Sequence, residues 1–191
     1  ECVFMSHFEY IMVMVSIIQG LGLTLALRGI SRLIRSPNRE IAVVVWAVFL
    51  VFLYLQNWWA FWDMASVENW NFFQFLLISL FVCVMYAMTE LMLPMAASPE
   101  TDWPAHFLSV RKWFFGMTVV LVFLGLSLNV YISGVPLLHP YRVMQFTILF
   151  LAIAGWITPR LAAQRWIATV VLVVLFTGQI LFRLLPGLSG M

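Results

Sequence analysis

Charged residues are scarce in this chain, and their scarcity excludes most soluble folds. Lys and Arg total 10 and Asp and Glu total 8 in 191 residues, so that charged residues make up 9% of the chain. Soluble domains carry about 25% charged residues. Hydrophobic residues reach 64%, and a soluble domain of this size could not bury so much apolar surface. A lipid bilayer must therefore cover it.

Residues that hold cofactors or catalyse reactions are also few. The chain has three histidines, two cysteines and a single lysine. They are His7, His106, His139, Cys2, Cys83 and Lys112. No histidine lies within an apolar run as bis-histidine haem ligation needs, the cysteines form no CxxC pair, and zinc-ligand spacing is absent. We expect no cofactor, no metal and no enzymatic activity.

Long apolar runs are what the sequence has in abundance. Crossing a hydrocarbon core of about 30 Å takes about 20 helical residues, and helices satisfy their own backbone groups in lipid. Six such runs cover residues 10–27, 41–62, 72–93, 113–133, 143–158 and 166–185. The sequence predicts an all-α, polytopic membrane protein with six transmembrane helices in one domain, residues 1–191.

Positive charge is concentrated in the odd-numbered connections between the predicted spans. These connections contain Arg28, Arg32, Arg35, Arg39, Arg111, Lys112, Arg160 and Arg165. The opposite side has only Arg142 and Arg183. Because Lys and Arg are retained in the cytoplasm, both termini are predicted to be non-cytoplasmic.

The arginines of the first connection suggest contacts with lipid headgroups. Arg28, Arg32, Arg35 and Arg39 follow one another at steps of 4, 3 and 4 residues, so they share a face if the first helix continues beyond the bilayer. We expect this face to bind anionic lipid headgroups, at about 1 kcal/mol per residue; the alternative is a cytoplasmic anion or partner site. Residues 98–110 are expected to form a short surface helix that begins at Ser98.

Polar side chains within the predicted spans gather in the outer third of the membrane. Because such groups are costly in hydrocarbon, they are expected to face the bundle interior. The polar stripes are Glu9, Ser16, Gly20 and Thr24 in the first span, Thr118, Gly125, Asn129 and Ser133 in the fourth, and Thr169, Phe176, Gln179 and Arg183 in the sixth. The substrate-path candidates are Glu9, Asn57, Trp58, Trp62, Gln74, Asn129, Gln179 and Arg183.

Two interpretations of these residues stay open. In the first, the amides of Asn57, Gln74, Asn129 and Gln179 converge on a water-accessible outer vestibule. Trp58 or Trp62 lies at its rim, and Glu9 pairs with Arg183 at its mouth. In the second, the amides only bond neighbouring helices, and the tryptophans belong to the aromatic belt at the headgroup level.

Three stretches carry a general resemblance to known proteins. Residues 8–10, 57–62 and 111–115 read Phe-Glu-Tyr, Asn-Trp-Trp-Ala-Phe-Trp and Arg-Lys-Trp-Phe-Phe. In these the chain resembles uncharacterised six-span bacterial inner-membrane proteins. The resemblance implies a six-helix fold in a bacterial inner membrane and no particular activity. Residues 22–25 also resemble residues 125–128, which suggests a 3+3 inverted repeat of the kind found in transporters.

Three functions are compatible with this pattern. One is a small channel or transporter for a small polar solute or ion. The alternative is a non-transporting scaffold or accessory subunit of a larger membrane complex, and a third is an enzyme acting on lipid or quinone at the interface. The expected partners are the bilayer, anionic headgroups, and a second copy or another membrane protein. No nucleic-acid partner is expected.

Overall fold

The computed structural model describes residues 6–67, 69–98, 100–132, 134, 136, 139 and 142–180. This part of the chain is all-helical and contains no strand. Its elements are α1 (His7–Arg35), α2 (Ile41–Trp62), η1 (Asp63–Ser66), α3 (Phe72–Met92), α4 (Trp103–Tyr131), α5 (Arg142–Ile157) and α6 (Leu161–Gln179).

Polar residues close the first turns of α1 and α3. The Ser6 hydroxyl accepts a hydrogen bond from the Glu9 backbone N–H at 3.2 Å, and the Glu9 carboxylate accepts one from the Ser6 N–H at 2.7 Å. Asn71 and Gln74 make the same reciprocal pair at 3.0 Å each. Such capping boxes satisfy backbone donors that the helix itself cannot, so Glu9 and Gln74 have local roles.

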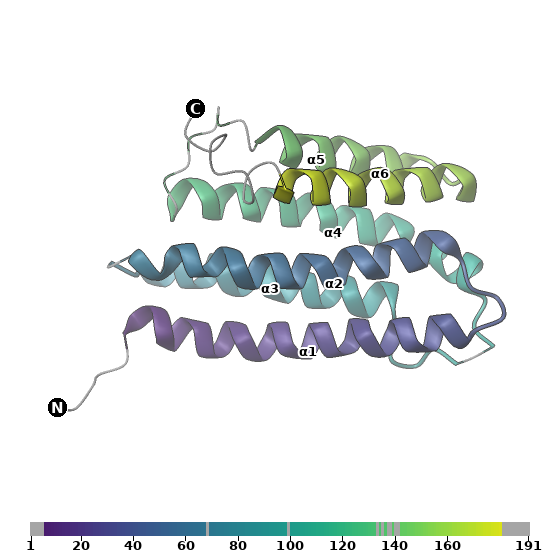
Figure 1. Ribbon diagram of the computed structural model, residues 1–191, viewed down its shortest axis with the longest axis horizontal. Coiled ribbons are helices and arrows are strands. Elements are labelled where there is room, and N and C mark those ends of the chain that lie inside the picture. The colour runs from purple at the N-terminus through teal and green to yellow at the C-terminus, as the bar shows by residue number, and fades with distance from the viewer. Residues whose placement is uncertain are drawn as a thin grey trace.

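The helices form an up-and-down bundle whose central part is a ring. Figure 1 shows α1 along one edge and α5 and α6 along the opposite edge, with α2, α3 and α4 between them. Contacts run from α3 to α4, α4 to α5, α5 to α6 and α6 back to α2, and a smaller contact between α2 and α3 completes the ring. Helix α1 packs outside this ring, against α2 and α3. The interior of the five-helix ring is therefore where a site could be enclosed.

An aromatic cluster fills the ring between the first half of α2 and the middle of α4. The Trp46 ring meets those of Phe114 and Phe115 edge-on, with centroids 5.0 and 5.5 Å apart. Phe49 contacts Trp46 in the same way at 5.2 Å. All four side chains are buried. Edge-to-face contacts of this kind are the preferred aromatic geometry, and here they close the axis of the ring.

Helices α4 and α5 are tightly packed at Gly155. A Cβ added there would lie 2.3 Å from Cζ of Phe115. Gly22 plays the same part between α1 and α2, where an added Cβ would lie 2.1 Å from the Tyr54 hydroxyl. Small residues at such crossings let membrane helices pack closely without help from the hydrophobic effect.

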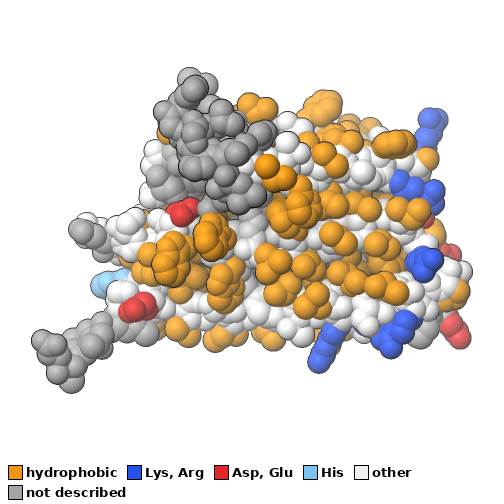
Figure 2. All heavy atoms as spheres, in the orientation of Figure 1, with side chains coloured by type: hydrophobic (Ala, Val, Ile, Leu, Met, Phe, Trp, Pro, Cys, Tyr) orange, Lys and Arg blue, Asp and Glu red, His pale blue; other side chains and the backbone are white. Residues whose placement is uncertain are grey.

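Five helices are long and apolar enough to cross a membrane: α1, α2 continued through η1, α3, α4 and α6. By length and composition, the chain is a multi-pass membrane protein. Helix α5 has only 16 residues, fewer than the roughly 20 that a bilayer requires, so a sixth span stays a prediction. Figure 2 shows a broad hydrophobic surface over the middle of the bundle, with Lys and Arg gathered at one end. This distribution fits contact with lipid.

Two expectations about the ends of the helices had different outcomes. Helix α1 does continue past its predicted span, to Arg35. The separate surface helix is wrong, because α4 begins at Trp103 and runs unbroken into the fourth span, with Asp102 as its N-cap instead of Ser98. Trp103 and Phe107 are fully buried. Their apolar face is in helical phase with the buried side of α4, so nothing separates the two segments.

The expected inward orientation of two polar stripes is also wrong. Gly20 and Thr24 of α1 are exposed, as is Thr169 of α6. Helix α6 instead turns Gln164, Ala168, Val171, Leu175 and Gly178 inward. A hydroxyl tolerates an outward position because it can bond the carbonyl four residues earlier, as Thr169 does with Arg165 at 2.9 Å.

Candidate functional site

A cavity of about 640 Å³ lies inside the five-helix ring. Its walls come from the second half of α2 and of α4, together with residues of η1, α3, α5 and α6. Because α2 and α4 both run away from the end that carries Arg35, Arg111 and Arg165, the cavity lies in the opposite half of the bundle. Its polar lining residues are Gln56, Asn57, Asp63, Ser66, Thr118, Asn129, His139 and Gln145.

Two asparagines line this cavity from different helices. Nδ2 of Asn57 on α2 donates to the backbone oxygen of Leu53 at 3.1 Å, and Nδ2 of Asn129 on α4 donates to that of Gly125 at 2.7 Å. Both of these hydrogen bonds stay within one helix, and Nδ2 of Asn57 also donates to Sδ of Met85 on α3 at 3.2 Å. Neither Oδ1 accepts a hydrogen bond from the described residues, so both oxygens remain as acceptors.

A buried arginine orients the amide of Gln145. Arg142, at the start of α5, is 2% exposed. Its Nη1 donates to Oε1 of Gln145 at 2.8 Å, and its Nε donates to the Pro136 backbone oxygen at 3.2 Å. With its oxygen engaged, Gln145 presents Nε2 toward α4, 3.7 Å from the Cβ position of Gly125. The amide N–H₂ group is thus a donor facing the cavity.

The remaining wall is apolar, and the end nearer the cation-rich end of the bundle is closed by the aromatic cluster. Side chains such as Leu121, Val122, Met144, Ile148 and Leu175 line the cavity between its few polar groups. Phe49 is shared with the aromatic cluster, which places that cluster at the cavity floor. A concave apolar site with a few convergent polar groups is the usual form of a small-molecule site.

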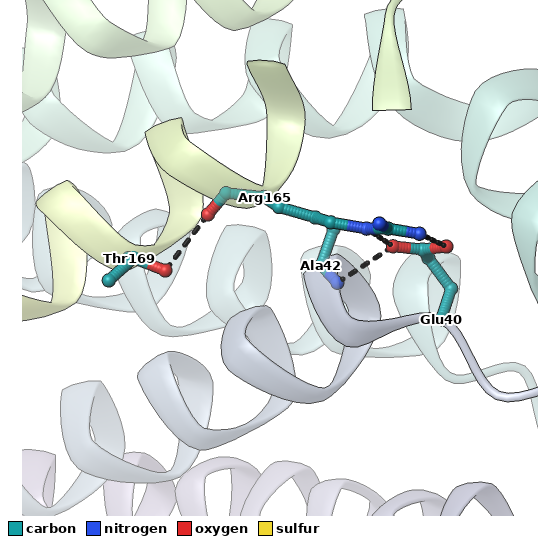
Figure 3. A network of polar contacts seen from close by, with 4 residues as sticks. All are labelled: Glu40, Ala42, Arg165 and Thr169. Carbon is teal, nitrogen blue, oxygen red and sulfur yellow. Dashed lines mark hydrogen bonds and ion pairs between the residues drawn. The ribbon is translucent and has the colours of Figure 1, made fainter. Parts of the chain in front are cut away.

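An ion pair joins α2 to α6 at the cation-rich end of the bundle (Figure 3). Nε and Nη2 of Arg165 donate to the two Glu40 oxygens at 2.7 and 3.0 Å. Glu40 is 3% exposed and also accepts from the Ala42 N–H at 3.2 Å, capping α2. The Arg165 hydrogen bond is the main cause that holds the pKa of Glu40 below its ordinary value, and burial opposes it.

The sequence-predicted residues divide between the cavity and other places. Asn57 and Asn129 both line the cavity. Thr118 and Gly125, which belong to the same predicted stripe of α4 as Asn129, line it too. Gln74 is not among the lining residues and caps α3 instead.

The other candidates of this group lie elsewhere. Gln179 lines neither described cavity, and its buried Nε2 has no partner among the described residues. Glu9 is exposed in its capping box. Ser133 and Arg183 lie outside the described residues, so the Glu9–Arg183 pair stays a prediction.

The three tryptophans near the end of α2 take different positions. Trp59 lines the large cavity. Trp58 lines a second cavity of about 250 Å³ beside Gln19, between α1 and α2. Trp62 lines neither and is 77% exposed. An exposed tryptophan at a helix end fits the aromatic belt.

The arginines of the first connection are partly committed to the protein itself. Arg32 donates to the backbone oxygens of Met95 and Leu93, beyond the end of α3. Arg35 bonds Ser31 on its own helix. Arg28 and Arg39 are exposed. The contact of this face with anionic headgroups stays a prediction.

Several cavity and contact residues were missed by reasoning from the sequence. Gln145 had a local signal, since Arg142 lies three residues before it on the first turn of α5 and can reach it. The Glu40–Arg165 pair had none, because its members are 125 residues apart. No three His, Cys, Asp or Glu side chains of the described segments come together to hold a metal ion.

No family model, curated protein or solved structure matches this chain. What it does must therefore be argued from the cavity.

Proposed function

We propose that this protein is a small transporter or channel that takes up a polar solute from the outer side of the membrane. The observation that carries the proposal is the 640 Å³ cavity inside the helix ring, with Asn57, Asn129 and Gln145 facing it. Asn57 and Asn129 are half-buried, and the Oδ1 atom of each has no partner among the described residues. A solute that donates to these oxygens gains about 0.5–1.5 kcal/mol for each hydrogen bond.

A transporter accounts for the closed inner half better than a permanently open channel. Below the cavity, the rings of Trp46, Phe114 and Phe115 fill the axis, and the Glu40–Arg165 pair holds α2 against α6. Passage inward requires these contacts to separate. In many transporters a central site is exposed to the two sides in turn, and the closed inner end corresponds to the outward-open state.

The rest of the proposal follows the distribution of charge and apolar surface. One domain, residues 1–191, crosses a bacterial inner membrane six times, with both termini outside. It performs no catalysis and works as a homo-oligomer or with another membrane protein.

Cysteine labelling tests whether the cavity opens outward. With Cys2 and Cys83 replaced by Ser, Asn57→Cys and Asn129→Cys should react with a membrane-impermeant thiol reagent added from outside. Leu21→Cys, on the exposed apolar face of α1, is the matched control and should stay unreactive, because a thiol in lipid rarely ionises. If neither cavity position reacts in folded protein, the vestibule does not exist.

Filling the cavity tests transport directly. A Cβ on Gly125 would meet only Phe81 and Gln145 at ordinary contact distance, whereas Gly20 has nothing within 4 Å. Gly125→Leu should therefore fold and obstruct the cavity, and Gly20→Leu should leave transport unchanged. Solute-driven swelling of proteoliposomes, followed by light scattering over a panel of polar solutes, should be lost only in Gly125→Leu. Equal swelling of the two variants would refute transport through this cavity.

A second candidate is an accessory subunit that packs on a partner helix. The observation that favours it is the outer face of α1, where Ser16, Gly20 and Thr24 recur at steps of four and no side chain covers Gly20. Small residues at this spacing often mark helix contacts in membranes. Under this function the two leucine variants exchange their effects: Gly20→Leu breaks the complex on a native gel, and Gly125→Leu is silent.

A further inference from the structure

We infer that the solute bound in the large cavity is an uncharged amphipathic molecule, with an N–H or O–H donor at one end and an apolar body. The inference rests on the proposed function and names its substrate class. It follows from three features of the cavity: its amide atoms without a hydrogen-bond partner among the described residues, its balance of charge and its apolar wall.

The amide groups of the lining are neutral, and they include both acceptors and a donor. Oδ1 of Asn57 and Oδ1 of Asn129 accept no hydrogen bond from the described residues, and the N–H₂ group of each amide donates to the carbonyl four residues earlier. Nε2 of Gln145 remains as a donor, because its oxygen is taken by Arg142. A solute that satisfies this set donates to two carbonyl oxygens and accepts from one amide. A primary carboxamide does so with a single functional group.

The described charges around the cavity cancel. Asp63 contributes one negative charge to its lining. Arg142 contributes one positive charge directly behind Gln145, and this guanidinium is already bonded to two oxygens. A cation would lie near Arg142 and an anion near Asp63, so neither sign is favoured.

The wall would make a dehydrated ion expensive. Apart from its few polar groups, the cavity is lined by Leu, Val, Ile, Met and Phe side chains. An ion that leaves water for such surroundings loses far more solvation energy than two amide oxygens or one N–H₂ group return. The same wall stabilises the apolar body of an amphipathic solute in proportion to the area it buries. The volume, about 640 Å³, also exceeds what a bare ion needs and lies in the range of small-molecule sites.

Four probes of similar size separate the alternatives: benzamide is neutral with a donor and an acceptor, benzoate is an anion, benzylammonium is a cation, and toluene has no polar group. Binding is measured by titration calorimetry on the protein in lipid nanodiscs, with empty nanodiscs subtracted. Benzamide should bind saturably and more tightly than the other three. Asn57→Leu and Asn129→Leu should each weaken benzamide binding roughly threefold to tenfold and leave toluene unchanged. Ser79→Ala, a polar residue of α3 that does not line the cavity, is the control and should bind as the unaltered protein does.

Tighter binding of benzoate or benzylammonium, weakened by Asn57→Leu, would overturn the neutral class and leave transport through the cavity standing. Saturable binding of toluene alone, or of none of the four, would also overturn it. The cysteine-labelling experiment is independent of these probes, so a failure of the proposed function itself appears there. Circular dichroism of each variant confirms that a loss of binding is not a loss of fold.

Discussion

The contact between Gly155 of α5 and Phe115 of α4 allows a test of how the five-helix ring is held together. In Gly155→Ala, the new Cβ would lie 2.3 Å from Cζ of Phe115 and 2.6 Å from both of its Cε atoms. Reaching a tolerable 3.4 Å requires the ring to retreat by about 1.1 Å (3.4 − 2.3). Phe115 is fully buried, and its ring contacts Trp46 and Phe114 with centroids 5.5 Å apart in each case. The ring therefore has no free space to move into.

The size of the effect follows from a matched glycine. Gly116→Ala, one residue after Phe115, would place its Cβ 3.7 Å from Trp156, which is an ordinary contact. Both substitutions gain about 1 kcal/mol of helix propensity, so this term cancels when they are compared. Overpacking a rigid core costs about 1–3 kcal/mol. Gly155→Ala should therefore be less stable than Gly116→Ala by about 1–3 kcal/mol.

The assay is the free energy of unfolding from SDS titration in mixed micelles, followed by tryptophan fluorescence. Replacing Phe115 by Leu in the Gly155→Ala background should recover part of the loss, because the shorter side chain leaves room for the methyl group. A double-mutant cycle should then show coupling between the two positions. Equal stability of the two alanine variants, or additivity with Phe115→Leu, would refute the close packing of α4 on Phe115.

Three further predictions concern the Glu40–Arg165 ion pair, the Tyr54–Thr89 hydroxyl pair and the orientation of the chain in the membrane. The Arg165 hydrogen bond lowers the pKa of Glu40. The contribution of the ion pair to the free energy of unfolding should therefore be complete above pH 4.5, the ordinary pKa of the carboxyl, and be lost as pH falls below it. Glu40→Gln should abolish this part of the acid sensitivity when the free energy of unfolding is measured from pH 7 to pH 3. Thr89 donates to the Met85 carbonyl, so the Tyr54 hydroxyl donates to Thr89; Tyr54→Phe should lower the free energy of unfolding by about 1 kcal/mol, and Thr89→Ser should preserve it. Tags on both termini should be reached by protease only from the non-cytoplasmic side, and a tag cleaved only from the cytoplasm would reverse the proposed orientation.

Helix positions were readable because long apolar runs in lipid have one stable backbone arrangement. The face of α4 was readable too, since Thr118, Gly125 and Asn129 recur at helical spacing. The same reasoning misplaced Gly20 and Thr24 of α1, because α1 packs outside the ring. Spacing along a helix shows which residues share a face, but not which neighbour, if any, covers that face.

The composition and the distribution of Lys and Arg along the sequence therefore determined that this chain is helical and apolar. They also determined that its cations gather at one end of the bundle. Only the tertiary structure decided which amides meet. It brought Asn57, Asn129 and Gln145 to one cavity and assigned Gln74 to a helix cap. It also paired Glu40 with Arg165 across 125 residues. The physical reason is that membrane insertion depends on the summed hydrophobicity of each segment, a local property. Contacts between helices depend instead on small residues and shape complementarity among segments far apart in the chain.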